Sequence, residues 1–403
     1  MTRAGRGGGL WLARAMAYPC PLAALCAAWL LLPAAAPAPV IAGPGAAAPA
    51  SSLAAPGAPV VGWRMALPGY RYRFPRDLAS HPEFQTEWWY YTGHLEGGGR
   101  RFGYQLTFFR VGLDPARAAS RSAWAPHSVY FAHAALTDES GRRYHADSRV
   151  MRPALGLAGA DTARYRVWVD DWSGGLDADG ITHRLEAAAG DFALDLALTP
   201  DKPPVIQGED GVSRKSAGLG RASHYVSFTR MTTSGRVALG RDTLSVTGSS
   251  WMDHEFGSNQ LGPGQAGWDW FSVQLDDGRE LMLYRLRLAN GHDEPMSSGT
   301  LVERDGRSRH LRLADFHITG DGAWKSPRSG AVYPARWRLE VPGAGIDLSL
   351  EPTVSDQEMD SPPPIAVSYW EGSVTARGTS GGRAVRGRGY VELTGYAGNV
   401  PGF

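Results

Sequence analysis

The feature that most constrains this chain is a two-residue alternation of apolar and polar side chains, which recurs from Trp63 to near the C-terminus. Residues 102–108 and 192–198 are clear examples, and turns such as the one at 276–278 separate many of these runs. Alternation places successive side chains on opposite faces of a β-strand. No stretch has the longer period of an extended amphipathic helix. We therefore predict an all-β protein built of antiparallel barrels or sandwiches.

The two halves of the chain contain matching segments. Residues 88–98 line up with residues 268–278, as an aromatic strand followed by an acidic or glycine turn. Residues 248–253 line up, in the same order, with residues 387–392. Two matches in one order favour tandem related domains over chance. The sequence therefore predicts one domain over residues 63–257 and a second over residues 258–403.

The N-terminus has the pattern of an export signal. Three arginines precede an apolar run at 22–32, and small residues follow at 34–36. The apolar run is too short to span a bilayer. We assign residues 1–38 to a signal peptide and the Ala/Pro-rich segment 39–62 to a flexible tether. The mature chain is then expected to be exported, to the periplasm or the medium, without a transmembrane anchor.

Charge and cysteine content narrow the possible functions. The formal net charge of +1 over 403 residues argues against a nucleic-acid partner. Both cysteines, Cys20 and Cys26, fall within the predicted signal peptide. The mature protein would therefore have no disulfide, no thiolate metal site and no cysteine nucleophile. Its stability would depend on core burial alone.

Residues 249–257, with the sequence SSWMDHEFG, combine an indole, two carboxylates and an imidazole in a strand-like segment. Alternation puts Trp251 and Asp253 on one face and His254 on the other. A carboxyl group beside a large apolar ring has a raised pKa, because burial disfavours its charged form. Asp253 is therefore the candidate acid, with His224 on a nearby strand as its partner. The alternative is a hydrogen-bonded hinge between two domains.

An aromatic cluster, Trp88, Trp89, Tyr90 and Tyr91, would line the interior of a barrel. In a large barrel the inward face is both core and ligand wall, so a core role and a binding role merge. Residues 199–222, rich in proline, glycine and charge, are too long for a simple turn. We expect this segment to cover a pocket.

Motifs of several other chemistries are missing from the sequence. There is no spaced histidine pair such as H-E-x-x-H, and alternation points His254 away from Asp253, so we predict no metal site. There is also no G-x-S-x-G nucleophile motif and no phosphate-binding glycine loop before a helix. The sequence therefore gives no support for a hydrolase or for a bound cofactor.

Four motifs together resemble the AttH and carotenoid 1,2-hydratase family, many exported members of which carry the label of secreted hydrolase. They are residues 87–93 (EWWYYTG), 223–225 (SHY), 251–257 (WMDHEFG) and 389–396 (GYVELTGY). The resemblance extends from about Pro68 to Gly398 and implies two lipocalin-like β-barrels in tandem. This agrees with the repeat found above.

The resemblance also implies a chemistry. In the hydratase branch, water is added across a terminal isoprenoid double bond, which an aspartic acid protonates with help from a histidine and aromatic residues. When positions are matched to the family motifs, Asp253 stands where the family has the catalytic acid, and His224 stands where it has the histidine. Trp251 stands where the family has a tyrosine, and Val226 stands where an aromatic residue is expected. A carbocation is stabilised by flanking aromatic faces, so Val226 is a departure that weakens the case for carotenoid hydration itself.

The leading hypothesis is an exported protein whose first domain holds a lipid or isoprenoid-like ligand in a dry hollow and hydrates it by acid catalysis. The predicted catalytic residues are Asp253, His224 and Trp251, and the predicted ligand-binding residues are Trp88, Trp89, Tyr90, Tyr225, Val226 and His254. The alternative is a non-catalytic periplasmic carrier of an apolar molecule, for which the AttH name suggests an ABC-type export system as partner. A third hypothesis is a filled barrel in which the motif is purely structural.

Overall fold

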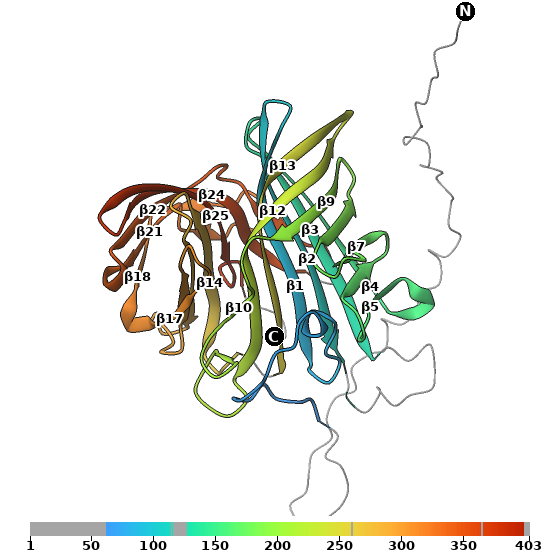
Figure 1. Ribbon diagram of the computed structural model, residues 1–403, viewed down its shortest axis with the longest axis horizontal. Coiled ribbons are helices and arrows are strands. Elements are labelled where there is room, and N and C mark those ends of the chain that lie inside the picture. The colour runs from blue at the N-terminus through green and yellow to red at the C-terminus, as the bar shows by residue number, and fades with distance from the viewer. Residues whose placement is uncertain (1–61, 114, 116–126, 259–260, 364–365, 399–403) are drawn as a thin grey trace, which may run out of the picture. The chain divides into compact units, whose positions relative to one another are not determined.

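Antiparallel strands make up most of the structure, which is a computed structural model (Figure 1). It describes residues 62–113, 115, 127–258, 261–363 and 366–398. The predicted signal peptide and all but the last residue of the predicted tether lie outside these residues. Within the described part, no helix is long and apolar enough to cross a membrane. The four short 3₁₀ helices found there are η1 (Arg76–Leu78), η3 (Ala154–Gly156), η4 (Leu313–Asp315) and η5 (Pro342–Ala344).

The larger sheet has 13 strands among the described residues and curls into a nearly closed antiparallel barrel. The short strands β10 (Val205–Ile206) and β11 (Ser213–Arg214) pair with β12 outside the main order. In order of pairing, the others are β4 (Arg143–Met151), β3 (Ser128–Asp138), β2 (Arg100–Gly112), β1 (Thr86–Gly97), β13 (Asp242–Ser258), β12 (Ala222–Leu239), β9 (Phe192–Pro200), β8 (His183–Ala188), β7 (Trp172–Leu176), β6 (Arg166–Val169) and β5 (Ala158–Ala160).

The second sheet has 10 strands among the residues described, and all of them follow residue 264. β23 (Glu358–Asp360) pairs with β24, and β19 (Trp324–Lys325) and β20 (Val332–Tyr333) form a separate hairpin. In order of pairing, the main strands are β17 (Ser308–Arg312), β16 (Ser298–Val302), β15 (Glu280–Leu288), β14 (Gln265–Leu275), β25 (Arg383–Leu393), β24 (Ser368–Ser380), β22 (Ile346–Pro352), β21 (Arg336–Val341) and β18 (His317–Asp321). The all-β prediction of two tandem lipocalin-like antiparallel barrels is confirmed.

The sequence repeat corresponds to a repeat of strand pairing. β1 lies between β2 and β13 in the first sheet, and β14 lies between β15 and β25 in the second. In the first sheet Tyr90 pairs with Asp253, and in the second Trp270 pairs with Glu392. Tyr90 and Trp270 occupy matching positions of the sequence repeat, and so do Asp253 and Glu392. The closing strands β13 and β25 are therefore equivalent in sequence and in register.

The interior of the first barrel is filled by a continuous apolar cluster. On β9, Phe192, Leu194, Leu196 and Leu198 all point into it, and the residues between them are partly exposed. Full burial of one such side chain contributes about 1.5–3 kcal/mol. The predicted dry hollow inside this barrel is therefore wrong, because its inward face is packed core.

The outer face of β1 and β13 contacts the second sheet. Gln274 Nε2 on β14 donates to the Ser250 carbonyl at 2.9 Å, and His94 Nε2 on β1 donates to the Gly389 carbonyl at 3.1 Å. A Cβ atom at Gly103 on β2 would lie 2.6 Å from Ser373 Cβ, so glycine is required for this close approach. Residues on the outer face of the first barrel are thus buried between two sheets instead of exposed to solvent.

Candidate active site

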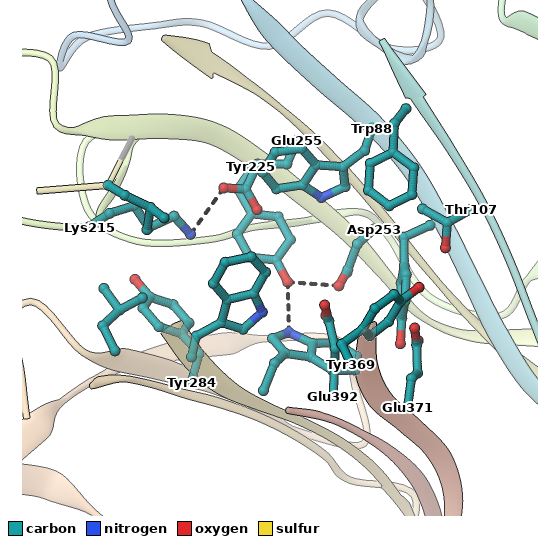
Figure 2. Close-up of a pocket in the computed structure, with 16 residues that line it drawn as sticks. Trp88, Thr107, Lys215, Tyr225, Asp253, Glu255, Tyr284, Tyr369, Glu371 and Glu392 are labelled. Carbon is teal, nitrogen blue, oxygen red and sulfur yellow. Dashed lines mark hydrogen bonds and ion pairs between the residues drawn. The ribbon is translucent and has the colours of Figure 1, made fainter. Parts of the chain in front are cut away.

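A pocket lies between the outer face of β1, β12 and β13 and the facing strands of the second sheet (Figure 2). Its volume of about 100 Å³ is several times what one water molecule needs. Carboxyl groups from both sheets reach it, together with one lysine. Its aromatic walls come from Trp88, Tyr90, Phe109, Tyr225, Trp268, Trp270, Tyr284 and Tyr369.

Asp253 on β13 faces this pocket with a side chain that is only 3% exposed. Three neutral donors hold its carboxyl group: Tyr225 Oη donates to Oδ2 at 2.7 Å, Ser227 Oγ to Oδ1 at 2.5 Å, and Trp251 Nε1 to Oδ1 at 2.7 Å. Burial raises the pKa of Asp253 to about 7, although these hydrogen bonds lower it. At neutral pH the group is therefore poised to hold a proton and to release it.

Trp270 of the second sheet supports the Asp253 site from the opposite wall. Its Nε1 donates to Tyr225 Oη at 3.1 Å, and that same hydroxyl donates to Asp253 (Figure 2). The chain of donors orients the tyrosine hydroxyl toward the carboxyl group. The acid of the first barrel is therefore held in part by the second sheet.

Lys215 and Glu255 form an ion pair at another edge of the pocket. Lys215 Nζ lies 3.0 Å from Glu255 Oε1 and 4.5 Å from the centre of the Tyr284 ring. Burial would lower the pKa of Lys215, but the charge of Glu255 keeps it raised. Lys215 belongs to the segment 199–222, which therefore borders the pocket as expected. Because this ammonium group is paired, it does not neutralise the other carboxyl groups of the pocket.

His224 is not the partner of Asp253. Residues alternate along β12, so Tyr225 and Ser227 face the acid while His224 and Val226 face the barrel interior. His224 Nδ1 donates to the Gly211 carbonyl at 2.9 Å. Burial lowers the pKa of His224 to about 4, so its ring is neutral. The expected pairing is wrong because the two side chains lie on opposite faces of the same sheet.

The remaining predicted residues divide between the same two faces. Trp88 and Tyr90 line the pocket, and Trp251 packs beside them. Trp89 points into the barrel, where its Nε1 donates to the Leu78 carbonyl at 2.9 Å. His254 lies beside Trp89 with ring centres 5.0 Å apart. Trp89, His254 and Val226 are therefore core residues and not ligand contacts.

Glu87 on β1 is the centre of a buried network on the interior face. Its carboxylate accepts from Arg110 Nε at 3.0 Å and contacts His81 Nδ1 at 3.0 Å and His254 Nε2 at 3.1 Å. Burial would raise the pKa of Glu87, but hydrogen bonds from both histidines and the charge of Arg110 hold it well below its usual value. Sequence reasoning found His254 but missed this network, because Glu87 and His81 are joined to it only by the fold.

The two histidines and Glu87 also have the spacing of a metal site. One ligand atom from each of His81, Glu87 and His254 lies within 4.8 Å of the others. Arg110, however, is 1% exposed and ion-paired to the same carboxylate. A buried cation beside this guanidinium group would meet like-charge repulsion. The arrangement is best explained as a charged hydrogen-bond network that stabilises the barrel.

Glu371 and Glu392 line the pocket but were not among the predicted site residues. Glu392 is the residue that the repeat aligns with Asp253, so comparison of residues 248–253 with 387–392 carried the signal that could have found it. Glu371 stands opposite Glu392 on the neighbouring strand. No sequence pattern marks Glu371, because its counterpart in the first sheet is Ser227, which is not acidic.

The sequence model of the AttH-like family matches residues 65–396 of this chain. The chain belongs to the AttH-like family. Among solved structures, a protein described as an AttH (NE1406) from Nitrosomonas europaea is 35% identical, with a TM-score of 0.74. The match covers 83% of this AttH-like chain and 99% of that one. The family assignment made from the sequence motifs is confirmed.

A second similar structure is that of kievitone hydratase from Nectria haematococca. It is 14% identical, with a TM-score of 0.65, and the match covers 81% of this chain and 93% of that one. At this identity the likeness is one of fold. A comparison with curated proteins finds no match to the AttH-like chain described here.

Proposed function

We propose that this AttH-like protein is a hydratase-type enzyme in which Asp253 protonates a carbon–carbon double bond of an apolar ligand. The observation that carries the proposal is the buried Asp253 carboxyl group, which faces an aromatic-lined pocket and has a pKa raised to about 7 by burial. An acid that holds a proton at neutral pH in a buried site is suited to general acid catalysis. The proton adds to one alkene carbon, and water adds to the other.

The walls of the pocket suit the charge that develops in this reaction. Protonation of an alkene leaves a carbocation, and the rings of Trp88, Tyr225 and Trp270 border the same space as Asp253. Aromatic faces attract cations by about 1–2 kcal/mol in desolvated sites. The family resemblance led us to expect an aromatic ring at position 226. Here aromatic residues of both sheets take that role in place of Val226.

The charge of the pocket favours an uncharged ligand. Among the described residues that line it, four carry carboxyl groups and one is a lysine, which is paired with Glu255. An anionic ligand such as a free fatty acid would meet buried carboxyl groups without a free cation to compensate. We therefore propose a neutral apolar substrate, with the isoprenoid end of a chain as the group that enters the cavity.

Two further observations are consistent with the proposal. Kievitone hydratase, with the same fold, is a precedent for hydratase chemistry on this scaffold. The arginines and the apolar run within residues 1–38 support export of the mature protein, which would place the enzyme in the periplasm or the medium.

The replacement Asp253→Asn tests the acid directly. Squalene, an uncharged chain with isoprenoid ends, is the probe, and its binding is measured by native mass spectrometry and its hydration by chromatography. We expect the variant to bind squalene as the wild type does and to lose on the order of 10²–10⁴-fold in turnover. Asp195→Asn, which changes a half-exposed carboxylate on β9, is the matched control and should retain full turnover.

A carrier is the competing function for the same pocket. In that case the wild type would bind squalene without converting it, and Asp253→Asn would change neither binding nor product. This result would contradict the proposed hydratase and favour a binding protein.

A further inference from the structure

The second sheet contributes an acid at the position that matches Asp253. Asp253 pairs with Tyr90 on the opening strand of the first sheet, and Glu392 pairs with Trp270 on the opening strand of the second. Both acids line the same pocket, and the charge of Asp253 is one of the causes that raise the pKa of Glu392. The pocket thus has an acid from each half of the repeat, on facing walls (Figure 2).

Glu392 is also one member of a carboxyl pair. Glu371 on β24 stands directly opposite Glu392 on β25, where Cβ atoms are about 5 Å apart. Neither group forms an ion pair with a basic residue in the described part of the chain. Two carboxylates at this spacing cannot both ionise without strong repulsion, so the pair holds one proton between them. Burial, and then the charge of Glu392, raises the pKa of Glu371.

Two tyrosines of the pocket adjoin the pair. Hydrogen bonding from Tyr90 and Tyr369 lowers the pKa of Glu371 against the effect of burial, and Trp268 acts on the pKa of Glu392 in the same way. The Tyr90 contact is loose, because neither its hydroxyl nor Glu371 Oε1 has a partner at strict hydrogen-bond geometry in the described structure. A polar group of the reaction, such as water, can therefore complete the hydrogen bonding of this pair at the pocket.

We propose that Glu392 is the second proton-transfer group of this pocket, the base that takes the proton of the attacking water, and that Glu371 positions it by sharing a proton with it. This inference rests on the proposed hydratase function. It assigns the two steps of the reaction to opposite walls, with the acid on the first sheet and the base on the second.

Atoms and charges balance across the two steps. The Asp253 proton forms a C–H bond with one alkene carbon, using the π electrons, and leaves a carbocation on the neighbouring carbon and a carboxylate on Asp253. The oxygen of a water molecule forms a C–O bond to the carbocation, and one of its protons passes to the Glu392 carboxylate. The proton then returns to Asp253 through water, and the net change is addition of one water to the alkene. Adding the water from the facing wall requires no movement of Asp253.

Deuterium separates the acid step from the base step. Squalene is incubated with each protein in D₂O, and mass spectrometry measures deuterium in recovered squalene and the amount of alcohol formed. Wild type should give both, and Asp253→Asn neither. Glu392→Gln should still place deuterium in the alkene, because Asp253 can deliver a deuteron to one alkene carbon and the cation can then lose a protium from the same carbon or from a neighbouring methyl group back to Asp253. Its alcohol formation should fall by on the order of 10²-fold or more.

Glu371→Gln tests the positioning role by a pH profile. Glutamine replaces the shared carboxyl proton with a weaker amide donor, so the Glu392 carboxylate is less stabilised and forms at higher pH. The acidic limb of the pH profile of alcohol formation should therefore move to higher pH, an effect that a loss of packing alone would not produce. Glu351→Gln, at an exposed glutamate on β22, is the matched control and should leave the profile unchanged.

Each contrary outcome points to one part of the scheme. If Glu392→Gln forms alcohol at the wild-type rate, Glu392 is not the base, and the role of Asp253 as the acid stands. If wild type and Asp253→Asn both leave squalene without deuterium and without alcohol, the hydratase proposal is overturned and the role of Glu392 falls with it. Circular dichroism checks that the glutamine variants are folded, which is expected because glutamine keeps the shape of glutamate and its side-chain amide can still hydrogen-bond.

Discussion

Two buried carboxyl groups on opposite faces of β1 and β13 behave in opposite ways. Glu87 on the interior face is 0% exposed, and Asp253 on the pocket face is 3% exposed. The pKa of Glu87 is held well below its usual value, whereas the pKa of Asp253 is raised to about 7. Burial raises the pKa of both carboxyl groups, but only Glu87 has a guanidinium group in contact, that of Arg110. The comparison teaches that the charge of the partners, and not depth of burial, decides which carboxyl group can hold a proton.

The largest effect is expected on the interior face. Glu87→Gln would leave Arg110 as a buried charge without its partner, which costs about 3–5 kcal/mol. The free energy of unfolding, measured with urea at neutral pH, should fall by that amount. Asp195→Asn is the surface control, and because it removes only an exposed ion pair with Arg236, it should change this free energy by less than about 1 kcal/mol. A small loss for Glu87→Gln would mean that the two carboxyl groups do not differ in the way described.

Asp253→Asn should have the opposite effect on stability, and the effect should depend on pH. The folded-state pKa of about 7 lies above the ordinary value of 3.8, so the favourable contribution of Asp253 is complete below about pH 4 and is lost as pH rises through 7. Asparagine does not ionise, so the free energy of unfolding of the variant should rise relative to that of wild type as pH rises from about 5 to about 8. Between these two pH values the gain is on the order of 3 kcal/mol. Urea unfolding at both pH values measures it, and a difference that is the same at both would contradict a raised pKa.

Trp251→Phe removes one of the three neutral hydrogen-bond donors to Asp253, and it therefore tests how much these donors affect the pKa of Asp253. The indole hydrogen bond lowers the pKa of Asp253, so its loss should raise that pKa further, by about one unit. The pH at which turnover falls should move upward by the same amount. Trp89→Phe makes the same replacement on the interior face and should leave that pH unchanged. A downward shift for Trp251→Phe would show that the indole does not stabilise the carboxylate.

His224→Gln is expected to have the smallest effect on activity. The imidazole lies on the interior face, bonded to Gly211 and packed against Tyr70 with ring centres 4.1 Å apart. Turnover of squalene should stay within about twofold of wild type, with a modest loss of thermal stability. A loss of turnover comparable to that of Asp253→Asn would show that the histidine acts in the reaction despite its position.

Much of the fold could be predicted from the sequence because the strands alternate. β9 shows the pattern clearly, since one face is core and the other is partly exposed. The family assignment and the raised pKa of a carboxyl group beside Trp251 also followed from residues alone. The repeat further aligned Asp253 with Glu392, although its meaning for the site depended on the pairing of β14 with β25.

The location of the pocket could not be predicted, and the reason is visible in β1. Nearly every residue of β1 is buried, because one face packs inside the barrel and the other against the second sheet. A strand covered on both faces carries no apolar–polar contrast to show which face is inward. Trp88 and Trp89 therefore look alike in sequence, yet one borders the pocket and the other is core. For the same reason His224 was assigned to the face of Asp253.

The position of the pocket between two sheets bears on how the protein becomes active during synthesis. Asp253 belongs to the last strand of the first sheet, whereas Glu392 and the wall around it are made about 140 residues later. A newly made first barrel would present Asp253 to water, where its proton affinity is that of an ordinary aspartate. The nascent chain would thus remain chemically inert until its final strand docks and closes the site.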